Sequence, residues 1–195
     1  FGLAVGNCYA TAELGLLALD TAGQMAMNLL PQPVIQLVDP DTGQDVGPGE
    51  VGEVVVTNFS RAYPLIRFGT GDMAVNVDPN PGQSKQEDRA IILVGRRGEA
   101  VKVRGMFVHP NQLRFAIRPF PVVNAIQGLV SRPEDRDFLT IRIAVDQGAD
   151  HQALVEPLKE SVRAVCRVRA DEIIIVTADE LPADAPGMLD EREWN

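Results

Sequence analysis

Residues 140–176 read TIRIAVDQGADHQALVEPLKESVRAVCRVRADEIIIV and decide the fold class of the second half of the chain. The runs at 140–145 and 173–176 are short and rich in β-branched residues, which is typical of strands. Between them, apolar residues recur at helical spacing over residues 150–165: Leu154, Val155, Leu158, Val162 and Val165. A strand, a helix and a second strand in this order indicate a β-α-β unit.

The residues before this unit extend the pattern upstream. Residues 101–104 predict a strand, Pro110 and Asn111 open a helix that we expect to reach about Arg118, and residues 125–130 predict a strand antiparallel to the next one. The order β-α-β-β-α-β fits a small ferredoxin-like α+β domain. We therefore expect the strands at 101–104 and 173–176 to share one sheet.

The first half of the chain predicts strands but no complete domain. Strands are expected at 34–38, 52–57 and 91–94, because each run is apolar and bounded by turn-forming residues. Residues 64–72 predict a loop, and residues 78–89 (DPNPGQSKQEDR) predict a long polar surface loop.

The change of composition near residues 78–98 predicts a domain boundary. We expect residues 1–94 to be the truncated, β-rich end of a large domain, because their strands complete no fold of their own. Residues 95–195 are expected to form a small, mobile α+β domain. The chain begins with Phe1 rather than Met, which agrees with a piece of a longer protein.

Composition describes an ordinary globular protein of 195 residues, 45% hydrophobic and 23% charged. The 18 Lys and Arg residues are scattered and outnumbered by 27 Asp and Glu, for a net charge of −9, so nucleic acid is disfavoured as a partner. Cys8 and Cys166 are too few for a disulfide framework. No apolar run reaches the roughly 20 residues of a membrane span, and no secretory signal is visible. We expect a cytoplasmic protein.

Three short segments carry residue types suited to chemistry. Residues 9–13 (YATAE) offer the Glu13 carboxylate, which alternatively is a solvated side chain at a helix start. Residues 64–72 (PLIRFGTGD) end in Asp72, whose two acceptor oxygens suit paired ribose hydroxyls, although a turn-capping Asp has the same pattern. Residues 95–105 (GRRGEAVKVRG) gather four cations, as phosphate handling requires or as a solvated hairpin face would show.

The order and spacing of these segments resemble the adenylate-forming superfamily and, within it, the phenylacetate–CoA ligase group. Residues 9–13 resemble its motif Y-G-x-[ST]-E, and residues 64–72 resemble P-x-I-R-[YF]-x-T-x-D. Residues 95–113 resemble G-R-x-x-x-x-x-x-R-G-x-x-[VI]-x-P-x-[QE]-[IL]. Residues 39–57 are similar to the strand-turn-strand that precedes the ribose motif. The resemblance therefore covers nearly all of the chain.

This resemblance implies a nucleotide site. On the matching positions, Tyr9 would stack on adenine, Asp72 would bind the ribose hydroxyls, and Arg96 would reach nucleotide oxygens from the hinge region. Glu13 would hold Mg²⁺ against the phosphates, which is reasonable because Mg²⁺ in proteins often takes only one or two carboxylates.

The resemblance also implies a moving C-terminal domain. Gly98 would be the hinge, since glycine has the wide backbone range that a pivot needs. The loop Val103, Arg104 and Gly105 would face the pantetheine arm of CoA after the domain rotates.

The sequence departs from the family pattern at the hinge, where Gly98 replaces the usual acidic residue, and in two further places. Ala10 and Ala12 stand where the family has Gly and Ser or Thr. The family's final motif places a lysine after a glycine near the C-terminus, but residues 181–192 (LPADAPGMLDER) contain none, and no lysine follows Lys159. That lysine would neutralise charge at the α-phosphate, so no catalytic residue is assigned.

The sequence thus predicts the C-terminal part of an ATP-dependent acid–CoA ligase, with ATP or AMP, Mg²⁺ and CoA as the implied cofactors and co-substrates. A small carboxylic acid would be the substrate, and we expect no membrane partner and leave a homodimer open. The chain by itself is expected to be inactive. The rival interpretation is a degenerate homologue that binds a nucleotide, a small molecule or a partner without catalysis.

Overall fold

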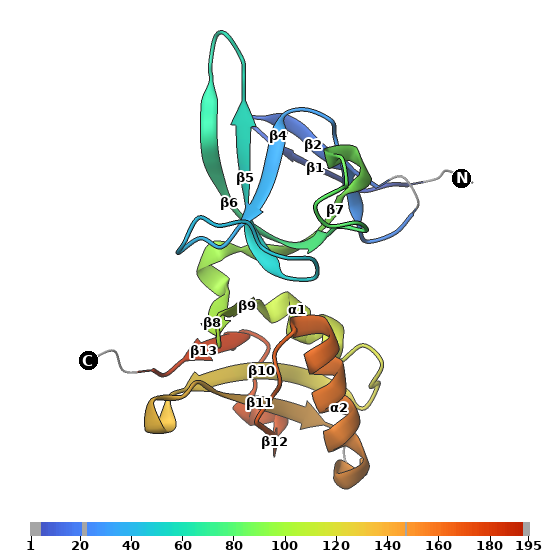
Figure 1. Ribbon diagram of the computed structural model, residues 1–195. Coiled ribbons are helices and arrows are strands. Elements are labelled where there is room, and N and C mark those ends of the chain that lie inside the picture. Colours follow the sequence, from blue (N-terminus) through green and yellow to red (C-terminus); the bar gives the residue numbers. More distant parts are fainter. Residues whose placement is uncertain (1–4, 21–22, 147, 193–195) are drawn as a thin grey trace. The chain divides into compact units, whose positions relative to one another are not determined.

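The computed structural model describes residues 5–20, 23–146 and 148–192. The chain divides into two compact units that meet between Arg97 and Gly98. Each unit has a hydrophobic core of its own, so each is described by itself. Figure 1 labels helices and strands of both units.

Among the described residues, the first unit is one seven-stranded antiparallel sheet with the order β1-β2-β3-β7-β6-β5-β4. The strands are β1 (Cys8–Thr11), β2 (Gly15–Leu19), β3 (Met27–Leu29), β4 (Val34–Val38), β5 (Val51–Asn58), β6 (Leu65–Val77) and β7 (Ala90–Arg96). A short 3₁₀ turn (Gln86–Asp88) lies in the polar stretch before β7.

The core of this sheet is built mainly from β-branched and leucine side chains. Leu17, Ile35, Val54 and Ile91 are all buried in it. These residues come from strands β2, β4, β5 and β7, and removing their apolar surface from water is what stabilises the sheet. The strands predicted at 34–38, 52–57 and 91–94 are confirmed.

Two expectations for the first unit were wrong. Glu13 lies in the turn of the β1–β2 hairpin, so the alternative of a helix start there is excluded. The predicted loop at 64–72 lies almost entirely in β6. Gly69 and Gly71 interrupt the apolar pattern of this segment, but backbone pairing with β5 on one side and β7 on the other still makes it a strand.

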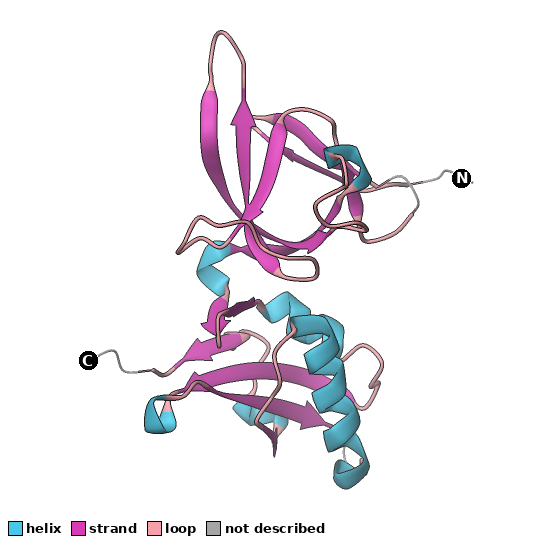
Figure 2. Ribbon diagram, in the orientation of Figure 1, coloured by secondary structure: helices cyan, strands magenta, loops and turns pink. Residues whose placement is uncertain are grey.

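The second unit is an α+β domain, as predicted (Figure 2). Its helices are α1 (Pro110–Ala116) and α2 (His151–Cys166), and its strands are β8 (Val101–Val103), β9 (Met106–Val108), β10 (Val123–Ser131), β11 (Phe138–Val145), β12 (Glu172–Val176) and β13 (Met188–Asp190). Three 3₁₀ turns (Arg97–Glu99, Pro133–Asp135 and Ala178–Glu180) connect them.

Helix α2 is held by its ends and by one apolar face. The Asp150 side chain accepts hydrogen bonds from the Gln152 and Ala153 amides, and Arg167 closes the C-terminus in the left-handed conformation. Its buried residues recur four positions apart and enter the core of the unit: Leu154, Leu158, Val162 and Cys166. Burial raises the pKa of the Cys166 thiol to about 12, so this cysteine acts as an apolar side chain.

The described strands of the second unit pair in the order β12-β11-β10-β13, with β10 antiparallel to β11 and β11 parallel to β12. The predicted β-α-β unit is therefore confirmed. Residues 101–104, however, do not join this sheet, so the ferredoxin-like order was wrong at its first strand. Arg104 and Gly105 both have positive φ and form a tight turn, which pairs β8 with β9 instead.

Within the described residues, neither helix is long and apolar enough to cross a membrane.

Candidate functional site

Asp72 lies in a bulge where β6 departs from its partner β5. Glu53 pairs with Met73, and Val55 pairs with Gly69, so three residues of β6 face one residue of β5. The bulge is held internally, because the Thr70 hydroxyl donates to the Val54 carbonyl (2.9 Å) and accepts from the Asp72 amide (3.1 Å). Gly71, at φ +75°, makes the reversal that a side-chain-bearing residue would strain.

The Asp72 carboxylate is held from two other strands. Tyr9 Oη donates to Oδ2 at 2.9 Å from β1, and Arg96 Nη1 donates to Oδ1 at 2.6 Å from β7. Burial and the Asp72 hydrogen bond raise the pKa of Tyr9, against a hydrogen bond with Thr70 that lowers it. Tyr9 is therefore a permanent donor at physiological pH. The structure thus brings together three residues that the sequence named for nucleotide binding.

A cavity of about 320 Å³ opens beside this carboxylate. Its lining residues all belong to the first unit: Ala10, Thr11, Glu13, Phe68, Thr70, Asp72 and Arg96. The volume is in the range of small-molecule sites. The cavity combines one fixed carboxylate (Asp72), one exposed carboxylate (Glu13) and one exposed cation, since the Arg96 side chain is 64% exposed.

The structure places Tyr9 differently from the expected stacking residue. Its side chain is 5% exposed, packs in the core of the first unit and is absent from the cavity lining. A ring buried in this way presents no open face to a base, whereas its hydroxyl reaches Asp72. Stacking on adenine therefore finds no support in the geometry, and the Tyr9 role that the geometry supports is orientation of Asp72.

Glu13 is the residue that could hold a metal ion. Its carboxylate is exposed and lines the cavity, and the described residues contain no cluster of three or more His, Cys, Asp or Glu side chains suited to a metal. Because Mg²⁺ in proteins keeps several waters and often takes only one or two carboxylates, a single exposed carboxylate such as Glu13 fits it. Glu13 would supply that ligand, and the ion would offset phosphate charge.

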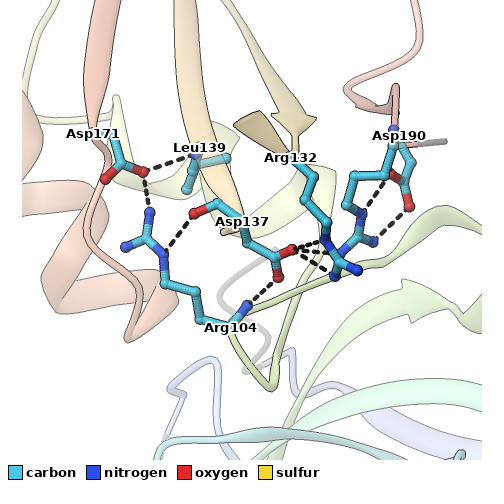
Figure 3. A network of polar contacts seen from close by, with 7 residues as sticks. Arg104, Arg132, Asp137, Leu139, Asp171 and Asp190 are labelled. Carbon is cyan, nitrogen blue, oxygen red and sulfur yellow. Dashed lines mark hydrogen bonds and ion pairs between the residues drawn. The ribbon is translucent and has the colours of Figure 1, made fainter. Parts of the chain in front are cut away.

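The predicted CoA-side loop is the β8–β9 turn, and its side chains are used within the second unit (Figure 3). Val103 is buried in the core. The Arg104 guanidinium forms an ion pair with Asp171 and donates to the carbonyls of Asp137 (3.2 Å) and Arg169 (3.1 Å). Gly105 is exposed with open space around its Cα. The main chain at Gly105 is therefore open to a ligand, whereas the Arg104 guanidinium is already paired within the unit.

Asp137 is the centre of that polar network (Figure 3). Its carboxylate accepts from the Arg104 amide (2.9 Å), from Arg132 Nε (3.1 Å) and Nη2 (2.8 Å), and from Arg192 Nη1 (3.3 Å). Burial raises the pKa of Asp137, but the hydrogen bonds from these three residues outweigh it and lower the pKa to about 2. Arg192 also donates to both carboxylate oxygens of Asp190 through Nε and Nη2. The network therefore connects the residues that follow β13 to the β8–β9 turn.

The stretch that lacks the family's lysine is part of the packed sheet. The residue after Gly187 is Met188, the first residue of β13, which pairs with β10 and is buried. Its sulfur packs against Gly128, where even a Cβ would collide with it. Met188 therefore offers neither a charge nor a mobile side chain.

Sequence reasoning missed Glu53, which lies under the bulge and contacts Gly71 and Arg97. A charged residue inside the apolar run of β5 was a signal that could have found it, since buried carboxylates are rare unless they have partners. Gly98, the expected hinge, is the first residue of the second unit, and its hinge role stays a prediction.

No protein-family model matches the chain. A phenylacetate-coenzyme A ligase of Thermus thermophilus is 29% identical over 129 residues, covering 65% of this chain and 29% of the relative. One of Escherichia coli is 24% identical over 155 residues, covering 75% of this chain and 35% of the relative. The chain thus spans about a third of the length of these curated relatives.

Among solved structures, the fold matches an open conformation of 2-hydroxyisobutyryl-CoA ligase in complex with 2-HIB-AMP and CoA. The TM-score is 0.69 at 20% identity, and the match covers 95% of this chain and 43% of that one. At this identity the match shows a shared fold.

Proposed function

We propose that this chain is part of an acid–CoA ligase. It is similar to phenylacetate–CoA ligases over part of their length, and it has the fold of adenylate-forming CoA ligases. In the proposed reaction a carboxylate attacks the α-phosphate of ATP and releases pyrophosphate, which leaves an acyl-adenylate. The CoA thiolate then attacks the acyl carbon, and AMP leaves as the thioester forms. Because ATP and CoA are abundant in the cytoplasm, the proposal places the reaction there.

The observation that carries the proposal is the fixed carboxylate of Asp72 at the cavity. Each of its oxygens accepts one hydrogen bond from the protein, from Tyr9 and from Arg96. A carboxylate has about four lone-pair sites, so one site remains on each oxygen. Two acceptors at the spacing of a carboxylate suit the vicinal hydroxyls of a ribose. Asp72 would therefore receive the sugar of ATP and AMP.

The other polar groups of the cavity fit the rest of the nucleotide. Arg96 is exposed and next to Asp72, so its guanidinium can turn toward phosphate or ribose oxygens. Glu13, on the β1–β2 turn, would hold Mg²⁺ at the phosphates. For CoA, the open main chain at Gly105 is the candidate contact in the second unit.

A second candidate function is nucleotide binding without catalysis. It is favoured by Met188, which is buried in β13 directly after the glycine of the expected lysine motif. A site with the ribose-binding carboxylate but without the cation at the reacting phosphate would bind adenylate and activate no acid. Acid-dependent exchange of pyrophosphate into ATP, measured on a protein that contains this chain together with the remaining length of the relatives, separates the two candidates.

The proposed function is tested by calorimetric titration of AMP into the 195-residue chain. Asp72→Ala should weaken AMP binding at least tenfold, since hydrogen bonds to charged groups contribute about 1.5–3 kcal/mol each. Asp184→Ala is the matched control, because it removes an exposed loop carboxylate of the second unit. Unchanged AMP affinity in Asp72→Ala, with only a lower melting temperature, would mean that Asp72 merely shapes its turn.

A further inference from the structure

Glu53 is a buried carboxylate that contacts the main chain of the bulge but does not line the cavity. It lies on β5, its residue surface is 7% exposed, and it is absent from the cavity lining. Its Oε1 accepts a hydrogen bond from the Gly71 amide at 3.1 Å, and its Oε2 pairs with Arg97 Nη1 at 3.3 Å. An acid in this position is costly to bury, so both of its oxygens have a partner.

The missing side chain of Gly69, on the facing strand β6, leaves space for this carboxylate. A Cβ on Gly69 would lie 2.7 Å from Glu53 Oε1, so only glycine leaves room for the side chain to reach the bulge. The Gly71 amide, two residues further along β6, is the one that Glu53 holds. The following amide, that of Asp72, is held by the Thr70 hydroxyl. The two contacts fix successive peptides of the bulge and thereby restrict the direction in which the Asp72 side chain leaves the main chain.

Two consecutive arginines complete the arrangement. Arg96 holds Asp72 and Arg97 holds Glu53, so the two carboxylates on either side of Gly71 are each paired with a cation at the end of the first unit. Arg97 also donates to the Pro40 carbonyl at 3.4 Å. The Glu53 side chain is thereby kept in one orientation, which an unpaired carboxylate on a strand would not be.

We propose that Glu53 is a positioning residue of the nucleotide site: its carboxylate holds the Gly71 amide and thereby aims Asp72 at the ribose hydroxyls. The proposal rests on the proposed function for the identity of the ligand. It adds a residue that does not contact the nucleotide and that determines how strongly the site distinguishes a ribose from a sugar without hydroxyls.

The test compares AMP with 2′,3′-dideoxy-AMP by calorimetric titration of the 195-residue chain. The wild-type chain should prefer AMP, and Glu53→Ala should reduce this preference about tenfold while changing affinity for the dideoxy nucleotide little. Glu53→Gln should keep most of the preference, because its amide oxygen still accepts from Gly71. A general loss of folding would lower both affinities together and leave their ratio unchanged.

A matched control is Glu50→Ala. Glu50 Oε2 accepts from the Gly47 amide at 2.8 Å, which is the same kind of bond in a turn that does not line the cavity. It should leave the AMP preference unchanged. Gly69→Ala should reproduce the effect of Glu53→Ala, because the added methyl displaces the carboxylate without removing its charge. A Glu53→Ala chain that keeps the wild-type preference overturns the inference and leaves the proposed function standing.

Amide hydrogen exchange separates the inference from the proposed function. If the wild-type chain binds no AMP, the proposed function fails, and exchange at Gly71 still tests the positioning contact. Glu53→Ala should speed exchange of the Gly71 amide at least tenfold relative to that of Ala74, which pairs with Gly52 beyond the bulge. Equal exchange at Gly71 in both chains would show that Glu53 does not hold the bulge.

Discussion

Replacing Asp137 by Asn should destabilise the second unit in a pH-dependent way. The Asp137 side chain is 12% exposed and accepts from the Arg104 amide and from the guanidinium groups of Arg132 and Arg192. Asn is nearly isosteric and keeps one acceptor oxygen, so the substitution removes charge and leaves the packing. It also places an NH₂ group among donors that then lack a partner.

The magnitude follows from the carboxyl pKa. A fall from 3.8 to about 2 corresponds to about 2 kcal/mol at roughly 1.4 kcal/mol per pH unit. Because the Arg132 side chain is 32% exposed, water screens part of this interaction. We therefore expect Asp137→Asn to lower the free energy of unfolding by about 1–2 kcal/mol at neutral pH.

The sign of the pH dependence is set by the lowered pKa. The folded protein holds the Asp137 proton more weakly than the unfolded chain, so the stabilisation is complete above pH 3.8 and is lost as the pH falls toward about 2. The difference in unfolding free energy between wild type and Asp137→Asn should be constant from about pH 7 to pH 5. It should shrink as the pH falls below about 4.

Urea unfolding of both chains across this pH range measures the difference directly. Asp184→Asn, in an exposed loop, is the matched control and should follow the wild type at every pH. No stability difference at neutral pH, or a difference that persists undiminished near pH 2.5, would refute the argument that Asp137 is stabilised as an anion by its three partners.

Three further predictions concern the second unit and the activity of the chain. Urea unfolding should show that His109→Ala lowers the unfolding free energy by roughly 2–4 kcal/mol, because the buried imidazole accepts from the Asn111 amide and caps α1. His109→Asn can still cap this helix and should recover part of the loss. Gly128→Ala should lower the unfolding free energy by about 1–3 kcal/mol in calorimetry, because the added Cβ collides with the Met188 sulfur. If that contact is the cause, the double variant Gly128→Ala with Met188→Ala should lose less stability than the two single variants added together. The 195-residue chain should exchange no pyrophosphate into ATP with any aryl carboxylic acid, because no lysine follows Lys159; exchange that depends on the acid would contradict this.

The sequence predicted the parts of the fold that depend on local pattern. The spacing of Leu154, Leu158 and Val162 identified α2, and the β-branched runs identified β4, β5, β11 and β12. The pairing of β8 could not be predicted, because a three-residue strand fits several partners and the choice depends on the turn at Arg104 and Gly105. Strand β13 was missed for the same reason of length.

The sequence identified residues of the candidate site but not how they are arranged. Asp72, Arg96 and Tyr9 were named from spaced motifs, and the structure brings their polar atoms together. That the Tyr9 ring would be buried depends on how β1 enters the sheet, which no local pattern reveals. Glu53 depends on a bulge between two strands, and such a register shift appears only when both strands are in place.

The bulge at Asp72 also has a consequence for how this chain tolerates insertions and deletions. Residue numbers of paired positions in β5 and β6 add up to 126 before the bulge, as in Glu53 with Met73, and to 124 after it, as in Val55 with Gly69. The difference, 126 − 124, is an even number, so inward and outward faces keep their phase across it. Deleting two residues from the bulge should pair β6 with β5 continuously from Val51 to Val56 and keep the same core, so a descendant could lose Asp72 and its bulge while keeping the sheet. Deleting one residue would instead make Met73 and Ala74, both fully buried, exchange the faces of the sheet on which they lie.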